Sequence, residues 1–185
     1  MIRYAFEASV VCAAAPFRPK GAVLSHFNLL MNTYIVLVTM AITGDDEIFL
    51  SGLPLFHISG LNLISPQILL GGTSVILATG DFDAAKVVDI LEQDKVTGCY
   101  FVPTQWQQIC EVPRVKDRKL SLKRMLWGAS VAPPSVLKSM EQTFVGVPTY
   151  NCFGQTEMSS LTTVLLGEDA ITKQGSVGKP IINVE

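Results

Sequence analysis

Two patterns of apolar and polar positions alternate along the chain, and together they predict its secondary structure. Short apolar runs rich in β-branched residues predict strands, and longer segments with apolar residues three and four positions apart predict helices. The predicted strands cover residues 48–55, 73–78, 98–102, 124–127 and 147–152. The predicted helices cover residues 29–42, 58–70, 84–93, 104–110 and 133–144.

This order of elements predicts the fold class. Strands that alternate with helices of about a dozen residues are typical of βαβ units and of a mostly parallel sheet. The strands are almost continuously apolar, which is typical of a sheet with helices on both faces. We therefore predict an α/β fold. Ligands of such folds bind beyond the carboxyl ends of the strands, and this rule selects Phe56-His57, Gly128-Ala129-Ser130 and the segment FGQTE at 153–157.

Several local signals refine these elements. Asp81 or Asp83 can cap the helix at 84–93, and Thr104 can cap the helix at 104–110. Pro66 and the pair Gly71-Gly72 predict the end of one helix and the start of the next strand. The charged stretch at 114–119 predicts a solvated surface loop.

None of the apolar segments is suited to cross a membrane. The segment 29–42 is shorter than the roughly 18 residues that a span needs and contains Asn32 and Thr33, so it predicts a helix that is buried on most faces. The N-terminal apolar run superficially resembles a signal peptide, but Glu7 interrupts it. We therefore expect no transmembrane segment and a cytoplasmic location.

The composition changes this picture in one respect. Of the 185 residues, 49% are hydrophobic and only 16% are charged, whereas an ordinary soluble domain carries about 25% charged residues. So little charge does not easily cover a globule of this size, and it indicates either a membrane protein or part of a larger globule. The net charge of −2 and the lack of a basic patch interleaved with aromatic residues argue against a nucleic-acid partner.

The four cysteines form no CxxC pair, so we expect reduced thiols and no zinc site. The cysteines are Cys12, Cys99, Cys110 and Cys152.

The segment FGQTE combines residue types that suit a nucleotide. Phe153 can stack on a base, and Gly154 allows a ligand to approach the backbone. Thr156 can donate a hydrogen bond to a phosphate oxygen, and Glu157 is a suitable oxygen ligand for a magnesium ion. Taken alone, these residue types favour an ordinary loop with Glu157 in solvent.

The other two segments also allow two interpretations. Gly128-Ala129-Ser130 could form a flat wall for a planar ring or a tight turn before the next helix. His57 could line an apolar substrate tunnel or serve only the structure. The segment GSVGKP at 175–180 is not a phosphate-binding Walker loop, because Lys173 stands where that motif requires glycine.

Five motifs together resemble the AMP-binding, adenylate-forming superfamily, specifically its fatty-acyl-CoA ligases. The matching segments are RPKGAVLSHFNLL (18–30), PLFHISGLN (54–62), WGASVAPPSVL (127–137), YNCFGQTEMSS (150–160) and GSVGKP (175–180). Each motif alone is weak, but five in the family's order are highly specific, and the resemblance covers residues 18–185.

The resemblance implies ligation of a fatty or other carboxylic acid to coenzyme A through an acyl-adenylate, with ATP and Mg²⁺. It implies that the catalytic residues are Thr156, Glu157 and His57, with Glu157 holding the metal. It implies that the nucleotide-binding residues are Lys20, Gly128, Ala129, Ser130, Phe153, Gly154, Gln155 and Thr156. It implies that His57, Gly60 and Met158 line the acyl pocket.

The sequence also departs from the family. The family's phosphate loop reads like TSGTTG, whereas residues 12–17 here read CAAAPF, and Phe153 replaces the family's usual tyrosine. We therefore expect residues 1–17 to be an atypical segment and residues 18–185 to be a partial AMP-binding domain. The expected domain lacks the ribose-binding aspartate motif and the C-terminal lysine domain.

Three interpretations follow for the chain as a whole. The first is a ligase fragment with little or no turnover. The second is a non-catalytic module that binds nucleotide or a protein partner, or self-associates through exposed apolar faces. The third is the product of a mis-started or frameshifted gene.

Overall fold

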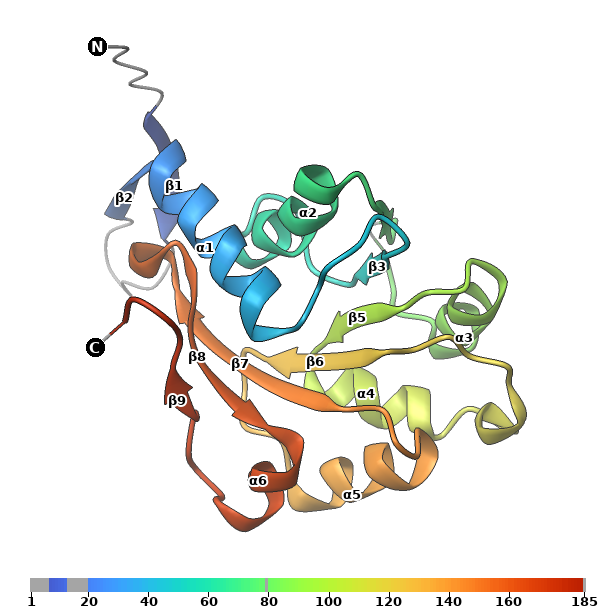
Figure 1. The fold of residues 1–185 in the computed structure, drawn as a ribbon. Helices are drawn as coiled ribbons and strands as arrows, with labels where there is room; N and C mark the ends of the chain where they lie inside the picture. Colours follow the sequence, from blue (N-terminus) through green and yellow to red (C-terminus); the bar gives the residue numbers. More distant parts are fainter. Residues whose placement is uncertain (1–6, 13–19, 79, 185) are drawn as a thin grey trace.

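The computed structural model describes residues 7–12, 20–78 and 80–184. Within these ranges, a seven-stranded sheet runs through the molecule (Figure 1). Its strands, in spatial order, are β4 (Thr73–Ile76), β3 (Ile48–Ser51), β5 (Gly98–Phe101), β6 (Arg124–Gly128), β7 (Thr149–Gln155), β8 (Ser160–Leu166) and β9 (Lys179–Pro180). The strands β1 (Glu7–Cys12) and β2 (Lys20–Ser25) form a separate antiparallel pair.

The sheet is mostly parallel, as the sequence predicts. The neighbours from β4 to β7 all run parallel, whereas β8 and β9 are antiparallel. The five expected strands are thus confirmed, although β3 ends at Ser51 and not at residue 55. Strands β8 and β9 and the β1–β2 pair are additions. The strand expected at 147–152 is shifted, because β7 runs from Thr149 through Gln155. Phe153, Gly154 and Gln155 therefore belong to a strand that pairs with β8, and not to a loop.

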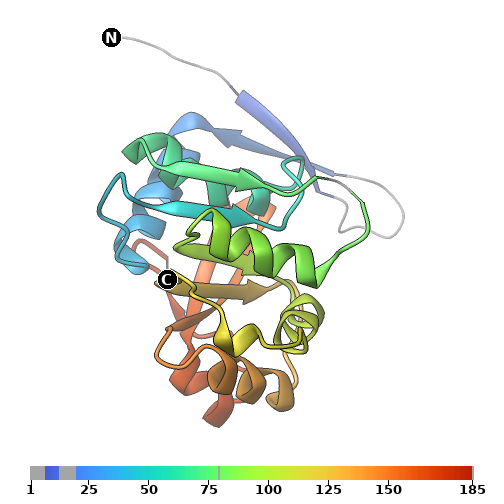
Figure 2. The same cartoon turned by 90° about the vertical axis from the view of Figure 1, so that its right-hand side faces the viewer.

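Helices cover both faces of this sheet. The helices are α1 (His26–Thr39), α2 (Ile58–Leu70), α3 (Ala84–Gln93), α4 (Pro103–Cys110), α5 (Pro134–Thr143) and α6 (Gly167–Thr172), with 3₁₀ turns η1 (Val115–Asp117) and η2 (Thr156–Met158). Figure 1 shows α1 and α2 on one side of the sheet and α3, α4 and α5 on the other. The turned view in Figure 2 shows the β1–β2 pair at the end of the molecule opposite α5 and α6.

Alternating side chains of the central strands supply two cores. Met125 and Trp127 of β6 belong to the core on the side of α3, α4 and α5, and Leu126 belongs to the core on the side of α1. In β5, Phe101 belongs to the first of these cores and Tyr100 to the second. This period of two is what a strand with two covered faces requires.

The helix ends follow the local signals in part. Asp83, and not Asp81, caps α3, and its carboxylate accepts a hydrogen bond of 3.1 Å from the Lys86 backbone N–H. The prediction that Thr104 caps α4 is wrong. This helix starts one residue earlier, because proline is tolerated in a first turn, and Val102 is its N-cap residue.

Helix α2 has the predicted bounds, but Pro66 lies inside it and does not end it. A proline leaves a carbonyl one turn earlier without its helical donor. Here that carbonyl, on Asn62, accepts a hydrogen bond of 2.9 Å from the Ser65 hydroxyl. The helix ends at Gly71, whose φ of +78° is a conformation that suits glycine.

Helix α1 is less buried than the sequence predicts. It begins at His26, after a capping box between Ser25 and Asn28, and one of its sides packs on the sheet. The other side carries an exposed apolar stripe. This α1 stripe consists of Phe27, Leu30, Tyr34 and Val38.

The charged stretch at 114–119 is mostly exposed, as predicted for a surface segment, but two of its residues also anchor it to the fold. Val115 is buried in the core. Arg118 bonds the carboxylates of Asp89 and Glu92 on α3, at 2.5 and 2.7 Å.

The strands begin at a buried ion pair, which ties the amino edge of the sheet together. The Arg124 guanidinium donates to both carboxylate oxygens of Glu47, at 2.6 and 3.0 Å. The Thr97 hydroxyl donates to the same carboxylate at 2.5 Å. These residues stand at the amino ends of β6, β3 and β5, so the opposite, carboxyl edge is left for a ligand.

None of the helices within the described ranges combines the length and the hydropathy that a bilayer crossing requires.

Candidate functional site

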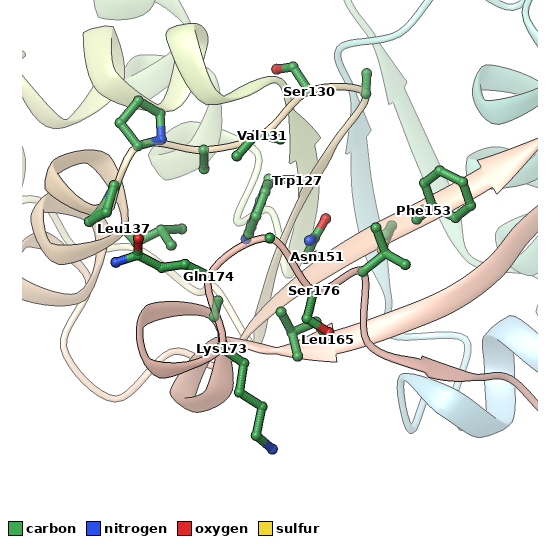
Figure 3. A pocket seen from close by; sticks show the side chains of 18 of the residues that line it. Trp127, Ser130, Val131, Leu137, Asn151, Phe153, Leu165, Lys173, Gln174 and Ser176 are labelled. Carbon is green, nitrogen blue, oxygen red and sulfur yellow. The ribbon is translucent and has the colours of Figure 1, made fainter.

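A cavity of about 690 Å³ opens at the carboxyl ends of β6 and β7. Its walls come from the turn after β6, the start of α5, the end of β7, and the loop between α6 and β9. Figure 3 shows Ser130 and Val131 on one side of this cavity, Phe153 at its rim, and Gln174 and Ser176 on the loop across it. We call it the large cavity. Two segments far apart in sequence, at 129–134 and 151–154, therefore share one hollow.

The turn after β6 explains why a glycine and small residues stand there. Gly128 is buried, and a Cβ at this position would lie 2.2 Å from the Cys152 carbonyl oxygen and 2.5 Å from the Tyr100 hydroxyl. Only glycine therefore fits. Ala129 adopts a φ of +66° to turn the chain. Ala129 and Ser130 line the large cavity, whereas Gly128 does not.

The end of β7 forms the neighbouring wall. The pairing of β7 with β8 shifts register between Phe153 and Gly154. A Cβ on Gly154 would lie only 1.6 Å from the Ser160 carbonyl oxygen, so the two strands touch at this point. Phe153 is 38% exposed and lines the large cavity together with Gly154.

The rest of the FGQTE motif lies beyond the large cavity. Thr156 is buried in η2, where its carbonyl oxygen accepts a hydrogen bond of 3.1 Å from the Ser159 N–H. Gln155, Glu157 and Met158 are exposed, and none of these four residues lines either of the two cavities described in this section.

Turn η2 lies beside β2, the strand that starts at Lys20. The motif that holds Lys20 and the motif that holds Glu157 are thus neighbours in space. Lys20 pairs with Cys12 across the hairpin through its backbone. The expected substitute for the phosphate loop, at 13–17, lies outside the described residues.

His57 and Gly60 both lie at the start of helix α2, where each supports the local fold. His57 is exposed, and its Nδ1 accepts a hydrogen bond of 3.2 Å from the Ser59 N–H, which caps α2. Gly60 is buried, and a Cβ there would lie 2.1 Å from the Pro54 carbonyl oxygen. Neither residue lines the two cavities at the strand ends, but their neighbour Ser59 lines the second one.

The second cavity is small, with a volume of about 40 Å³, and lies on the α1 and α2 side of the sheet. We call it the small cavity. It shares Cys152, Phe153 and Gly154 with the large cavity. Its other lining residues are Val36, Met40, Ser59, Asn62, Leu63, Tyr100, Leu126, Ser160 and Leu161.

Both cavities have electrically neutral walls near neutral pH. Burial raises the pKa of the Cys152 thiol to about 12, and burial together with the nearby Cys152 raises the pKa of the Tyr100 hydroxyl. The ammonium of Lys173 pairs with Asp169 at 2.8 Å, and Figure 3 shows its end turned away from the large cavity. The walls therefore suit an uncharged ring or an uncharged chain.

Sequence reasoning missed three parts of the large cavity. Trp127 lines it with an indole N–H that has no hydrogen-bond partner within the described ranges. Asn151 also lines it, and its position two residues before Phe153 on one strand was the available signal. The loop at 173–177 overlaps the glycine motif at 175–180, but its position across from Ser130 depends on β8 and α6, which the sequence pattern does not predict.

Among the described residues of the FGQTE motif, Glu157 is the carboxylate that could bind a magnesium ion. Within the described part of the chain, no three His, Cys, Asp or Glu side chains gather to hold a metal ion. Glu157 is a single exposed carboxylate. Magnesium sites in nucleotide enzymes often use one or two carboxylates together with substrate phosphates, so Glu157 fits an ion that arrives with the nucleotide.

Comparisons with known proteins show what this chain is similar to. Residues 18–185 match the family described as "AMP-binding enzyme". The chain is 33% identical over 163 residues to an indoleacetate–CoA ligase of Aromatoleum aromaticum, covering 88% of this chain and 31% of that protein. It is 32% identical over 168 residues to a 2-succinylbenzoate–CoA ligase of Bacillus pumilus, covering 91% and 33%. The chain thus spans about one third of the length of these relatives.

Solved structures show the same likeness. The o-succinylbenzoate coenzyme A synthetase of Bacillus subtilis, in complex with ATP and magnesium ion, superposes with a TM-score of 0.83 at 26% identity, covering 94% of this chain and 35% of that one. The N-terminal domain of FACL13 from Mycobacterium tuberculosis has the same fold, with a TM-score of 0.83 at 22% identity, covering 94% and 43%.

Proposed function

Because this chain belongs to the AMP-binding enzyme family, we propose that it forms the nucleotide-binding part of an ATP-dependent acid–CoA ligase. One observation carries the proposal: the turn at Ala129-Ser130 and the strand end at Phe153-Gly154 line one cavity. Its neutral walls and the ring of Phe153 suit an adenine base, and its volume of about 690 Å³ is ample for a nucleoside.

The proposed reaction has two steps. The substrate carboxylate attacks the α-phosphorus of ATP, and pyrophosphate leaves, which gives an acyl-adenylate. The sulfur of coenzyme A then attacks the acyl carbon, and AMP leaves. The protein must bring anions together and hold them in line. A magnesium ion bound with ATP supplies positive charge that offsets the charge of the phosphates.

We infer that the motif at the end of β7 and in η2 serves the phosphates. In this proposal the base lies in the large cavity and the triphosphate runs toward η2. In the same proposal, Thr156 contacts a phosphate and Glu157 holds the magnesium ion. Lys20 is a further candidate for the phosphates, because its strand β2 lies beside η2. His57 contributes as the cap of α2, whose next residues reach the small cavity.

The test is calorimetry with this chain, using Mg-ATP and AMP. We expect both nucleotides to bind. The variant Glu157→Gln should weaken Mg-ATP binding about tenfold and leave AMP binding unchanged, because only ATP brings the ion that Glu157 holds. The matched control is Glu141→Gln, an exposed carboxylate on α5.

A second variant tests the position of the base. Asn151 lies in the wall of the large cavity between Trp127 and Ser176 (Figure 3), so Asn151→Trp places a large ring there and should abolish binding of both nucleotides. The proposal fails if neither nucleotide binds the parent chain, or if Asn151→Trp leaves AMP binding intact while the variant remains folded.

We expect little acyl-CoA formation by this chain alone, because residues 12–17 lack the glycines and hydroxyls that would wrap pyrophosphate. The second candidate is a non-catalytic nucleotide-binding module. The lack of the phosphate-loop glycines and hydroxyls at residues 12–17 also favours this candidate. An assay with ATP, magnesium, coenzyme A and a carboxylic acid tests this expectation. Product formation that depends on Glu157 would exclude the module, whereas nucleotide binding without product is expected of both candidates.

A further inference from the structure

The loop at residues 173–177 forms one wall of the large cavity, across from the turn after β6 (Figure 3). Every residue of this loop is exposed. Ser176 and Val177 lie between Gly175 and Gly178, whose φ angles of +80° and +93° are conformations that suit glycine. Packing therefore constrains this wall little, and its position depends on hydrogen bonds.

Within the described ranges, one hydrogen bond joins this loop to the sheet. The Thr163 hydroxyl, on β8, donates to the Val177 carbonyl oxygen at 2.5 Å. The Ser176 N–H donates to the Lys173 carbonyl oxygen at 3.1 Å, so that bond stays within the loop. The Lys173 ammonium pairs with Asp169, which belongs to α6 and not to the sheet. The spacing between loop and sheet therefore depends on the Thr163 hydroxyl.

Thr163 is also adjacent to a second wall of the large cavity. It pairs with Phe153 of β7, which lines the cavity. It lies two residues before Leu165, another lining residue, and therefore on the same face of β8. Thr163 itself is not a lining residue. It thus connects the wall at Phe153 with the wall at Val177 from outside the space that a ligand would occupy.

We propose that Thr163 is a positioning residue of the nucleotide site, whose hydroxyl holds the loop at 173–177 at the spacing from Phe153 that a bound nucleotide requires. This inference rests on the proposed function. A loop that is already held in place binds a ligand more tightly, because it has less conformational freedom to lose. Without the hydroxyl, open arrangements of the loop gain population and the affinity for nucleotide falls.

The neighbouring threonine supplies a matched control. The Thr162 hydroxyl is buried and has no hydrogen-bond partner in the part of the chain that the structure describes. Replacement of threonine by valine keeps the β-branched shape that suits a strand and removes only the hydroxyl. Thr162→Val therefore removes an unpartnered group, which should cost little, whereas Thr163→Val removes the bond to the loop.

The test is calorimetry with AMP on the parent chain and on the variants Thr163→Val, Thr163→Ser and Thr162→Val. We expect Thr163→Val to weaken AMP binding about fivefold. Thr163→Ser retains the hydroxyl and should restore the affinity of the parent chain, and Thr162→Val should leave it unchanged. Urea denaturation checks that each variant is folded. If Thr163→Val does not fold, Thr163→Ala removes the same hydroxyl and takes its place.

Cleavage by trypsin after Lys173 examines the loop in the absence of nucleotide. Proteolysis of a transiently opened segment follows the population of its open form, so Thr163→Val should be cut there about fivefold faster than the parent chain. Cleavage after Lys116, in η1, is the internal reference. An unchanged ratio of the two cleavage rates would show that the hydroxyl does not hold the loop, and the inference would be overturned.

The AMP measurements separate this inference from the proposed function. If the parent chain binds AMP and Thr163→Val binds it equally tightly, the nucleotide site stands and the inference falls. The inference also falls if Thr163→Ser or Thr162→Val loses as much affinity as Thr163→Val, because the loss would then not depend on this hydroxyl. If the parent chain does not bind AMP, the proposed function fails and the inference fails with it.

Discussion

Gly154 is the residue at which the site and the fold depend most directly on each other. It lines both cavities, and β7 and β8 touch there. The sequence motif identified it as a glycine that lets a ligand approach the backbone. In the structure, the Ser160 carbonyl oxygen of the neighbouring strand β8 also lies close to the Gly154 backbone.

We expect Gly154→Ala to destabilise the fold by at least about 2 kcal/mol, because the new methyl group would collide with backbone that cannot move without separating two strands. Chemical denaturation measures this loss in the free energy of unfolding. The control is Gly21→Ala on β2, where no atom lies within 4 Å of the new Cβ. Similar stabilities for the two variants would show that β8 can move away from β7.

Asn32 is a second residue whose role became visible only in three dimensions. Its side-chain amide donates to the Leu161 carbonyl oxygen at 2.9 Å and accepts from the Leu161 N–H at 3.3 Å. This buried amide binds α1 to β8 across 129 residues of sequence. The sequence offered it only as an argument against a membrane span.

We expect Asn32→Ala to lower the free energy of unfolding by about 2–3 kcal/mol, because it leaves a buried N–H and a buried carbonyl without partners. The matched control is Asn28→Ala, which removes the exposed capping box at the start of the same helix and should cost about 1 kcal/mol. Thermal and urea denaturation compare the two. A smaller loss for Asn32→Ala than for Asn28→Ala would contradict the assignment.

At the scale of elements, the sequence predicted best where local pattern and packing agree. The helix Ile58–Leu70 has the predicted bounds, because apolar spacing and Gly71 both mark it. Pro66 was misleading because Ser65 supplies the missing donor, and that contact requires the folded helix.

The C-terminal elements could not be predicted in the same way. Strand β8 departs from the expected βα alternation, since it returns antiparallel beside β7 after η2. The position of β8 is set by its pairing with β7, and β7 extends three residues beyond its predicted end at residue 152. The walls of the large cavity at 173–177 depend on this return, so only the part of the site on β6 and β7 could be predicted from the sequence.

The α1 stripe is the element whose exposure has a direct consequence in solution. Phe27 and Val38 are 69% and 65% exposed, and they lie on one side of the helix together with Leu30 and Tyr34. An apolar stripe on the surface favours association.

We therefore expect sedimentation to show self-association that increases with concentration, and we expect the double variant Phe27→Ser/Val38→Ser to reduce it. The control Val145→Ser replaces an isolated apolar side chain, 83% exposed, beyond the end of α5. Equal effects of the two sets of substitutions would indicate that general hydrophobicity, and not the stripe, drives association.

At the scale of the molecule, the carboxyl edge of the sheet carries the cavities and the amino edge carries the buried ion pair. Burial of Glu47 disfavours its charged form, but the hydrogen bonds from Arg124 and Thr97 and the charges of Arg124 and Lys123 together outweigh burial and hold the pKa of Glu47 below its usual value. A carboxyl with a lowered pKa stabilises the fold at neutral pH, and this stabilisation is lost as the pH falls through the folded-state pKa.

We expect the unfolding free energy to decrease as the pH falls below about 5. Glu47→Gln should cost about 3–5 kcal/mol at pH 7, because it leaves the Arg124 charge buried without a partner, and it should flatten the acid dependence. The control Asp117→Asn breaks an exposed pair with Arg114 and should cost less than about 1 kcal/mol. An unchanged acid slope in Glu47→Gln would place the acid sensitivity elsewhere.

The position of Trp127 has an optical consequence. The chain has two tryptophans, and Trp106 is sealed in the core with its indole N–H bonded to the Leu126 carbonyl oxygen at 3.0 Å. Only the indole of Trp127 forms part of a cavity wall, so a molecule that enters there should change one emission and leave the other as an internal reference. The protein therefore carries its own fluorescent reporter, and occupancy of the large cavity can be titrated without a label.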